Sequence, residues 1–255
     1  METTSWKLGI VMPACDAAAT IRPTLERIPV GQLEDAGIDF RVYVVDDGST
    51  DDTVPRAEAA RPGLGDRLEI LRHEANRGYG AAQKTGLGAS LRAGAAGHVI
   101  LHSDGQYAPE EINDVVAPIR SGHADVAIGS KFAKGSVLAQ GMPFMRVVGI
   151  RFFDWLENRI FGLRNLEFHS GYMAYSTHAL RSIDYADLTD RYHFDGEMVL
   201  CAAKTGLAIH KAPISTRYHT GTSLKVLPYI LEIAGVLRKY AAKGYAFQAK
   251  ARHGS

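Results

Sequence analysis

The residues most able to do chemistry lie in three polar segments, each of which directly follows a short apolar run. The first segment is Asp46-Asp47-Gly48-Ser49, after the run RVYVV at 41–45. Adjacent carboxylates at the end of a buried strand are costly unless a partner pairs with them. The doubled Asp therefore indicates ligand binding, because a carboxylate accepts hydrogen bonds from a nucleobase N–H or a ribose hydroxyl. A β-turn followed by a helix cap is the structural alternative, since Asp and Ser favour both.

The second segment is the glycine-rich stretch Asn76-Arg77-Gly78-Tyr79-Gly80, which follows the apolar run 68–72 and leads into a helical pattern. Glycines allow the backbone to approach a phosphate or a ribose closely, and the N-terminus of the following helix favours an anion. The stretch does not match a Walker A loop, because no Gly-Lys-Ser/Thr follows it. A plain loop is the alternative interpretation.

The third segment is His102-Ser103-Asp104-Gly105-Gln106, after the apolar run 98–101. Side chains at alternate positions beyond a strand point the same way, so His102, Asp104 and Gln106 could face one cation. Asp104 is the natural oxygen ligand for Mg²⁺ or Mn²⁺, which often bridge the phosphates of a substrate. A polar turn with one capping Asp is the alternative.

The elements that must position these segments alternate along the first half of the chain. Strands are predicted at 8–12, 41–45, 68–72, 98–101 and 125–128, with helices at 17–27, 51–60, 76–91 and 109–120. Apolar strands separated by helices predict an α/β fold with a Rossmann-like, mostly parallel sheet that carries helices on both faces. Such sheets bind ligands at the carboxyl ends of their strands, where all three polar segments lie.

The second half of the chain is less regular. It predicts a loop at 131–141, helices at 143–161, 195–205 and 223–245, and strands at 168–175 and 208–218. We find no internal repeat and no linker, so we expect one domain over residues 1–255.

Composition and charge exclude several classes of protein. The 255 residues are 46% hydrophobic and 22% charged, which is ordinary for a folded domain and excludes disorder, collagen and coiled coil. A net charge of +1 is too small for the chain as a whole to bind nucleic acid as a polyelectrolyte. The two cysteines, Cys15 and Cys201, exclude a disulfide framework or a zinc ribbon. No uncharged apolar run reaches the ~20 residues of a membrane span and no signal-type segment opens the chain, so we expect a cytoplasmic protein.

Together the polar segments resemble the family 2 inverting glycosyltransferases, and in particular the branch with dolichol-phosphate mannose synthase and the polyprenyl-phosphate sugar transferases. The similar segments run in the family's order over residues 8–225. They are Pro13-Ala14-Cys15-Asp16 (family P-A-Y-N), Val45–Asp51 (V-D-D-G-S-x-D), Asn76–Gly80 (N-x-G-x-G), His102–Gln106 (D-x-D-x-Q), Gly129-Ser130-Lys131 (G-S-R), Ser170-Gly171-Tyr172 (S-G-Y/F) and Arg217–Ser223 (R-x-x-x-G-x-S).

This resemblance implies a GT-A fold and a nucleotide-diphosphate sugar, GDP-mannose or a UDP-sugar, as the donor. It implies a nucleotide-sugar-binding part at about 8–130, an acceptor-binding part at about 131–225, and a C-terminal helix and tail at about 223–255. The donor site would include Pro13, Ala14, Asp16, Asp47, Asn76, Gly78, Lys131 and Ser223.

The resemblance also implies a divalent cation, Mg²⁺ or Mn²⁺, held by Asp104 and Gln106. His102 stands where the family has its first Asp, and Mn²⁺ tolerates imidazole better than Mg²⁺ does. Lys131 in place of Arg keeps the charge but loses the bidentate fork. The cation, Lys131 and Arg217 would neutralise charge that develops on the leaving diphosphate, while the acceptor attacks from the opposite face with inversion.

A hydroxyl acceptor needs a general base, for which Asp195 and Glu197 are the candidates, whereas a phosphate acceptor is already an anion. Capping of the helix that starts there is the alternative role for both carboxylates. Further along, a lipid phosphate would find an anion pocket in the family's R-x-x-x-G-x-S region, made here of Arg217, His219, Ser223 and Lys225.

The helix predicted at 143–161 carries aromatic residues among arginines, a mixture that suits a membrane surface or a lipid chain. Core packing and a homodimer contact are the alternatives for this helix.

We therefore expect an inverting glycosyltransferase that acts on a polyprenyl or dolichyl phosphate, at most peripheral to the membrane. The alternatives are a small-molecule acceptor in natural-product or polysaccharide assembly, and a nucleotide-sugar-binding module without turnover. A nucleotidyltransferase is disfavoured, since no Gly-rich, basic signature follows the first strand.

Overall fold

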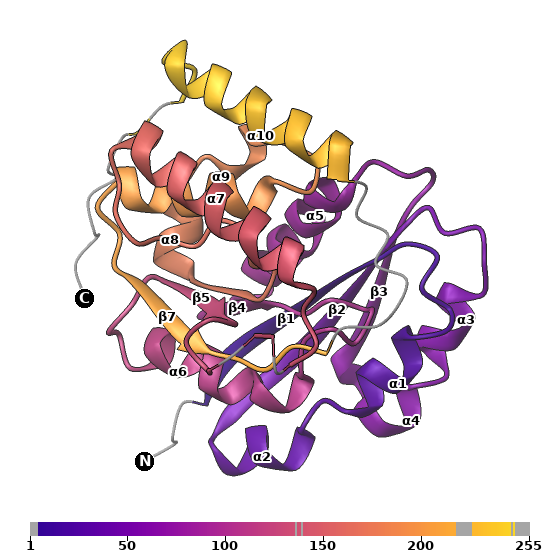
Figure 1. The fold of residues 1–255 in the computed structure, drawn as a ribbon. Coiled ribbons are helices and arrows are strands. Elements are labelled where there is room, and N and C mark those ends of the chain that lie inside the picture. The colour runs from indigo at the N-terminus through magenta and orange to yellow at the C-terminus, as the bar shows by residue number, and fades with distance from the viewer. Residues whose placement is uncertain (1–4, 136, 139, 218–225, 246, 248–255) are drawn as a thin grey trace.

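The computed structural model describes residues 5–135, 137–138, 140–217, 226–245 and 247. One seven-stranded sheet lies between two layers of helices (Figure 1). Its strand order is β3-β2-β1-β4-β6-β5-β7. The strands are β1 Trp6–Ala14, β2 Ile38–Asp47, β3 Leu68–His73, β4 Gly97–Ile100, β5 Val126–Ser130, β6 Met173–Ser176 and β7 Ile209–Pro213.

The sheet is mostly parallel, as the sequence predicts. β1 pairs in parallel with β2 and with β4, β2 with β3, and β5 with β7. β6 runs antiparallel to both of its neighbours, β4 and β5. Because β6 alone is reversed, the carboxyl ends of the other six strands and the beginning of β6 all lie at one edge of the sheet, which we call the carboxyl edge.

Helices cover both faces of the sheet (Figure 1). One face carries α1, α2, α3, α4 and α6, and the other carries α5, α7, α8, α9 and α10. Their bounds are α1 Ile21–Glu26, α2 Val30–Asp35, α3 Thr53–Glu58, α4 Arg61–Leu64, α5 Tyr79–Arg92, α6 Ile112–Arg120, α7 Phe144–Phe161, α8 Thr177–Ser182, α9 Phe194–Lys204 and α10 Val226–Ala241.

Alternation along the central strand supplies both layers of the core. In β1, Ile10 and Met12 pack into the first hydrophobic cluster and Val11 into the second, on the opposite face. Successive side chains of a strand point to opposite faces, so a fully apolar strand requires cover on both sides. Gly86 of α5 permits close contact here, because a Cβ at this position would lie 2.3 Å from Val11 Cγ1.

Two strands are shorter than the sequence predicts: β6 begins at Met173 rather than at 168, and β7 ends at Pro213 rather than at 218. The residues that flank them serve the carboxyl edge instead. The segment before β6 leaves the ladder, and Ser170 Oγ donates a hydrogen bond to the Gly129 carbonyl (2.6 Å). Beyond β7, Thr216 forms an isolated antiparallel bridge with Tyr107. Three short helices, α2, α4 and α8, are additions to the predicted elements.

Candidate active site

The loops after β1 and β2 are joined by hydrogen bonds at the carboxyl edge. Asp16 has a φ of 47°, a left-handed conformation that Asp tolerates better than most residues. Its N–H donates to Ser49 Oγ (3.0 Å), and its Oδ1 accepts from the Thr50 N–H (2.8 Å). Pro13 and Ala14 are buried beneath this junction, whereas Asp16 is exposed. Of this predicted set, Asp16 is thus the side chain open to a ligand.

Asp47 is buried and organises the glycine-rich segment. Its Oδ1 accepts from the Arg77 N–H (2.9 Å) and contacts His73 Nδ1 (2.7 Å), and its Oδ2 accepts from the Gly78 N–H (2.8 Å). These contacts give the Asp47 carboxylate the hydrogen-bond partners that a buried carboxylate needs, and the sequence alone did not identify them. Asn76 is exposed beside the first loop, where its Nδ2 donates to Cys15 Sγ (3.2 Å).

The glycines of this segment make room for the protein's own backbone. A Cβ at Gly78, whose φ is 109°, would lie 2.3 Å from the Asp190 carbonyl oxygen. A Cβ at Gly80 would lie 2.5 Å from the Thr189 carbonyl oxygen, and the Gly80 N–H donates to Asp190 (2.8 Å). The glycines therefore allow the backbone of residues 189–190, rather than a ligand, to approach closely, and this backbone covers the N-terminus of α5.

The loop after β4 presents the predicted cation ligands. Asp104 is exposed, and its Oδ1 accepts from the Gln106 N–H (2.9 Å), which fixes the loop. Gln106 is buried, and its carbonyl accepts from the Arg217 N–H (2.8 Å). The segment that contains Arg217, predicted to bind the acceptor, thus lies directly against this loop. A carboxylate and an amide oxygen fit a hard divalent cation.

His102 belongs to a hydrogen-bonded chain that the sequence did not reveal. Its Nε2 lies 2.6 Å from the Tyr79 hydroxyl, which donates to Asp195 Oδ2 (2.9 Å). Gln83 Nε2 donates to the other oxygen, Oδ1, of Asp195 (2.9 Å). Because the Tyr79 hydrogen goes to Asp195, His102 donates from Nε2–H, and Nδ1 is the nitrogen left for a cation. We call His102, Tyr79 and Asp195 the relay.

Gly171 makes the position of His102 possible. A Cβ at this residue would lie 2.3 Å from His102 Nε2 and 3.1 Å from the Tyr79 hydroxyl. The imidazole also meets the Tyr107 ring edge-on at 4.9 Å, and Tyr107 accepts a hydrogen bond from the Gly171 N–H (3.0 Å). Gly171 belongs to one of the family motifs, Ser170-Gly171-Tyr172, but the sequence did not predict that it packs against His102.

Burial sets the protonation of the relay. It raises the pKa of Asp195 to about 7, against the hydrogen bonds from Gln83 and Tyr79, which favour the carboxylate. Burial also lowers the pKa of His102, although the nearby Asp104 carboxylate opposes this shift. A carboxyl group with a pKa near neutral pH and a neutral imidazole form a pair suited to proton transfer.

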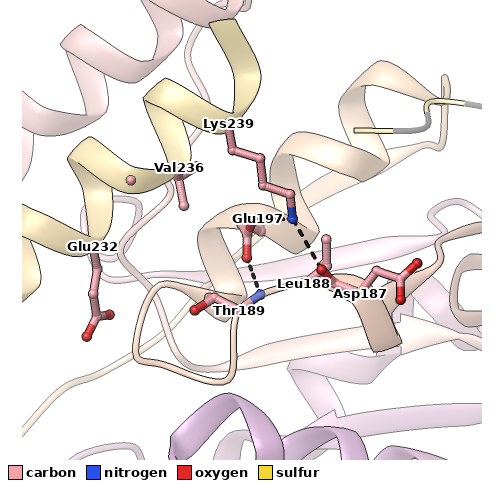
Figure 2. Close-up of a pocket in the computed structure, with 8 residues that line it drawn as sticks. Asp187, Leu188, Thr189, Glu197, Glu232, Val236 and Lys239 are labelled. Carbon is pink, nitrogen blue, oxygen red and sulfur yellow. Dashed lines mark hydrogen bonds and ion pairs between the residues drawn. The ribbon is translucent and has the colours of Figure 1, made fainter. Parts of the chain in front are cut away.

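Glu197 faces away from this chain of contacts. Residues two apart on a helix do not share a face, and α9 directs Asp195 toward α5 and Glu197 toward α10. Glu197 Oε2 accepts from the Thr189 N–H (2.5 Å), and Oε1 contacts Lys239 Nζ (3.4 Å) and the Tyr245 hydroxyl. It lines a pocket of about 340 Å³ with residues of α10, including Glu232 and Val236 (Figure 2).

The predicted basic residues, Lys131 and Arg217, also lie at the carboxyl edge. Lys131 is buried, and its Nζ donates to the His169 carbonyl (3.0 Å). Burial and, to a smaller extent, Arg146 lower the pKa of Lys131 to about 8. Arg217 is exposed next to the cation loop. Ser223, with His219 and Lys225, lies outside the described residues.

The fold and these converging loops are those of an α/β enzyme that binds its ligand at the carboxyl edge of its sheet. Residues 9–187 match Glycosyl transferase family 2, so the chain belongs to this family of glycosyltransferases. It is 29% identical over 212 residues to the polyprenol monophosphomannose synthase of Mycolicibacterium smegmatis, which covers 77% of this chain and 79% of that protein. It is 31% identical over 203 residues to the undecaprenyl-phosphate mannosyltransferase of Micrococcus luteus, over 77% of this chain and 82% of that protein.

Solved structures confirm the predicted GT-A fold. Glucosyl-3-phosphoglycerate synthase from Mycobacterium tuberculosis in complex with uridine diphosphate matches with a TM-score of 0.69 at 22% identity, over 93% of this chain and 80% of that chain. The same enzyme in complex with Mn²⁺, UDP-glucose and phosphoglyceric acid matches with a TM-score of 0.64 at 21% identity, over 92% of this chain and 79% of that chain.

Proposed function

We propose that this glycosyltransferase moves a sugar from a nucleotide-diphosphate sugar to a lipid phosphate of the polyprenyl or dolichyl type, with inversion at the anomeric carbon. The relatives named as polyprenol and undecaprenyl-phosphate mannosyltransferases support this acceptor class. The synthase of similar fold, crystallised with UDP-glucose, supports the donor class.

The donor lies across the exposed rim of the carboxyl edge. Asp16 and Asn76 are the side chains open to the base and the ribose, above the buried Pro13 and Ala14. Asp47 acts indirectly, because its two oxygens hold the backbone of Arg77 and Gly78 in place.

Asp104 and Gln106 are the residues that would hold a divalent cation, Mg²⁺ or Mn²⁺, and His102 would add a ligand only through Nδ1. Such a cation, when bound, stabilises negative charge on the leaving nucleoside diphosphate. The Mn²⁺ in the synthase of similar fold supports a divalent ion in this role.

The reaction makes one bond and breaks one. An oxygen of the acceptor phosphate attacks the anomeric carbon, and the bond from that carbon to the diphosphate oxygen breaks as the nucleoside diphosphate leaves. Lys131 and Arg217 lie beside the cation loop, where their charges stabilise the departing diphosphate. Burial lowers the pKa of Lys131 to about 8, and the negative charge of a bound phosphate would favour the protonated amine.

The exposed face of α7 is the observation that carries the choice of acceptor. Four apolar side chains at helical spacing form a stripe that we call the α7 stripe: Phe144 (64% exposed), Val148 (44%), Phe152 (52%) and Trp155 (60%). The helix begins at the acceptor side of the edge, since Arg146 of its first turn acts on Lys131. An anionic head group at Lys131 and Arg217 would place an apolar tail along this stripe.

The helices in the described part of the chain do not include one long and apolar enough to span a bilayer. Contact through the α7 stripe would therefore be contact with a membrane surface.

The test is an acceptor competition. Purified protein is incubated with GDP-mannose or a UDP-sugar and Mn²⁺, together with either a polyprenyl phosphate in detergent micelles or 3-phosphoglycerate in buffer. We expect a sugar-phosphate-lipid whose anomeric configuration, read by NMR, is opposite to that of the donor. Turnover with 3-phosphoglycerate but not with the polyprenyl phosphate would contradict the lipid acceptor. Donor binding without turnover of either acceptor would identify a binding module.

A hydroxyl acceptor is the second candidate, and the relay favours it. The synthase of similar fold was crystallised with phosphoglyceric acid, and a hydroxyl must lose its proton as it attacks. Asp195, with a pKa of about 7 and a hydrogen-bonded route through Tyr79 to His102, is suited to accept that proton. In that case the Asp195→Asn variant would lose turnover, whereas a phosphate acceptor would tolerate the change.

A further inference from the structure

Helix α7 is inverted with respect to an ordinary amphipathic helix. It exposes Phe152 and Trp155, and it buries Asp154 (7% exposed) and Glu157 (0% exposed). Surface helices normally direct apolar residues inward and charged residues outward. Burying a carboxylate is expensive unless cationic or hydrogen-bonding groups surround it. The inner face of α7 therefore requires a partner of positive charge.

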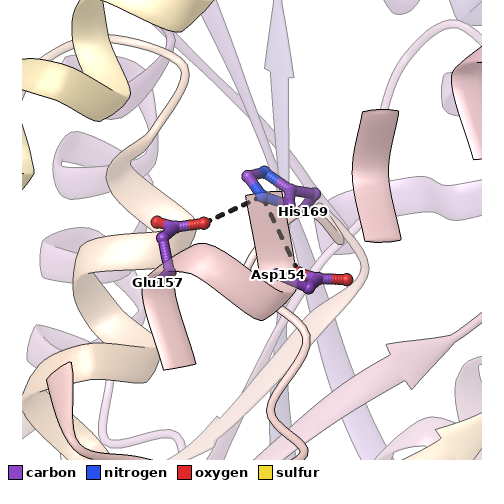
Figure 3. A group of neighbouring side chains, drawn as sticks. All are labelled: Asp154, Glu157 and His169. Carbon is purple, nitrogen blue, oxygen red and sulfur yellow. Dashed lines mark ion pairs between the residues drawn. The ribbon is translucent and has the colours of Figure 1, made fainter. Parts of the chain in front are cut away.

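His169, in the segment before β6, lies opposite these two carboxylates (Figure 3). Its Nε2 is 2.9 Å from Glu157 Oε2 and 3.7 Å from Asp154 Oδ1. One ligand atom from each of the three residues lies within 4.8 Å of the other two. Two carboxylates and one imidazole, spaced in this way, could share one metal ion.

The short contacts of Glu157 with His169 and His193 are poorly aligned for hydrogen bonds. By their geometry, His169 Nε2, His193 Nε2, both Glu157 oxygens and Asp154 Oδ2 are buried without a well-directed hydrogen-bond partner. The Glu157 oxygen thus lies to the side of the direction in which the imidazole nitrogen donates or coordinates. Neighbouring ligands of a shared metal ion have this arrangement, because each lone pair points at the ion rather than at the other ligand.

A second layer of contacts fixes each of the three residues. The Tyr229 hydroxyl lies 2.6 Å from His169 Nδ1, and the Phe168 N–H donates to Asp154 Oδ1 (2.9 Å). His193 Nε2 lies 2.8 Å from Glu157 Oε1. Metal-ligating histidines usually use their second ring nitrogen for such a contact, which sets the tautomer that coordinates.

We propose that Asp154, Glu157 and His169 form a second metal site, separate from the cation of the donor, for a divalent transition ion of the Zn²⁺ type. Zn²⁺ takes imidazole nitrogen and carboxylate oxygen together, and its two positive charges neutralise the two buried carboxylates. The ion would fasten α7, whose outer face carries the α7 stripe, to the segment that leads into Ser170 and Gly171. Its role would be structural, since Asp154 and Glu157 are buried and both come from α7.

The test uses the Asp104→Ala variant, in which the donor cation site is removed. This variant is dialysed against Zn²⁺ and then against buffer, and its bound metal is counted by mass spectrometry. Co²⁺ loading follows, because its visible absorption reports ligand type and geometry. We expect one equivalent of bound metal, a rise in melting temperature with Zn²⁺, and Co²⁺ bands.

Matched variants locate the metal in the Asp104→Ala background. Glu157→Gln and His169→Gln keep the side-chain size, and each should lower the bound metal to near zero. His123→Gln, an exposed histidine that contacts Ser121, should retain the full equivalent. An Asp104→Ala protein that binds no Zn²⁺ and shows no shift in melting temperature would overturn the proposal and leave an ion-pair cluster. Metal retained in both ligand variants would overturn it equally.

Discussion

The protonation of Asp195 is set by its buried surroundings. Aspartate in an unfolded chain releases its proton near pH ~3.9, whereas the folded protein holds the Asp195 proton until about pH 7. Between these values the folded state binds more protons than the unfolded state, so the free energy of unfolding falls as pH rises.

We therefore expect the wild type to lose about 3 kcal/mol of stability between pH 5 and pH 8, relative to the Asp195→Asn variant. Other titrating groups are common to both proteins and cancel in the comparison. Urea unfolding of the two proteins at both pH values measures this difference. Parallel pH dependence in wild type and variant would show that Asp195 is ionised throughout the range.

Tyr79 is the link between Asp195 and His102, and Tyr79→Phe removes only its hydroxyl. The change leaves His102 Nε2 and one Asp195 oxygen without their partner, which should cost about 1–3 kcal/mol of stability. If the acceptor is a hydroxyl, kcat should fall about 10²-fold while the KM for the donor stays the same. Steady-state kinetics with thermal unfolding separates the two effects. A donor KM that rises while kcat holds would instead place Tyr79 in donor binding.

Gly171 offers a steric test of the same chain of contacts. Gly171→Ala would force His102 to move, because the new Cβ would lie 2.3 Å from Nε2, and overpacking of this kind costs about 1–3 kcal/mol. Gly149→Ala in α7 is the control, since its Cβ would meet nothing within 4 Å. It should stabilise the protein by up to about 1 kcal/mol through helix propensity. Equal melting temperatures for the two variants would refute the packing of His102 against Gly171.

Single residues of this site differ in how far the sequence predicts them. The chemistry of Asp104 follows from its residue type and from its place after a strand. The sequence marks Asp47 as a candidate binding residue, but its partners come from the backbone of a loop about thirty residues away, which no local pattern encodes. Tyr79 and Gln83 belong to a helix whose inner face meets α9, and that meeting is a property of the tertiary fold.

At the scale of elements, α7 carries the clearest prediction. The Phe152→Ser/Trp155→Ser double variant removes two exposed aromatic side chains, each worth ~1.5–3 kcal/mol when fully buried in an apolar phase. We expect its binding to anionic phospholipid vesicles to fall at least tenfold in a sedimentation assay. Leu231→Ser, which removes an exposed apolar residue of α10, should bind as the wild type does.

The alternative for the α7 stripe is a homodimer contact. Two results together would favour a homodimer contact over membrane contact. The wild type would not bind vesicles, and analytical ultracentrifugation would show a wild-type dimer that becomes a monomer in the double variant.

Helix α7 also marks where pattern reasoning stops. Its residues at helical spacing predict the helix correctly at 143–161. Which face is buried could not be predicted, because the inner face is acidic and depends on His169 and His193 from distant segments. The parallel strands were predictable for the opposite reason, since their continuous apolar runs leave only one arrangement, with helices on both sides.

At the scale of the whole molecule, the sheet brings the separate segments together. Asp47 ends β2, and Asp104 lies in the loop after β4. Because β1 lies between these two strands, their ends are about 10 Å apart. Reversal of β6 brings Gly171 to the same edge, and the bridge between Thr216 and Tyr107 brings Arg217 there. The antiparallel direction of β6 could not be predicted from the sequence, because a run as short as Met173-Ala174-Tyr175 carries no signal of strand direction.

We propose that this edge holds a nucleotide-diphosphate sugar through a cation at Asp104. Titration calorimetry of GDP-mannose and UDP-sugars, with Mn²⁺ or with EDTA, tests it in three proteins: wild type, Asp104→Ala, and Asp39→Asn at the opposite edge. We expect wild type and Asp39→Asn to bind at least one donor more tightly with Mn²⁺ than with EDTA, and Asp104→Ala to lose this gain. If Asp104→Ala bound the donor with Mn²⁺ as tightly as the wild type does, Asp104 would not hold the cation.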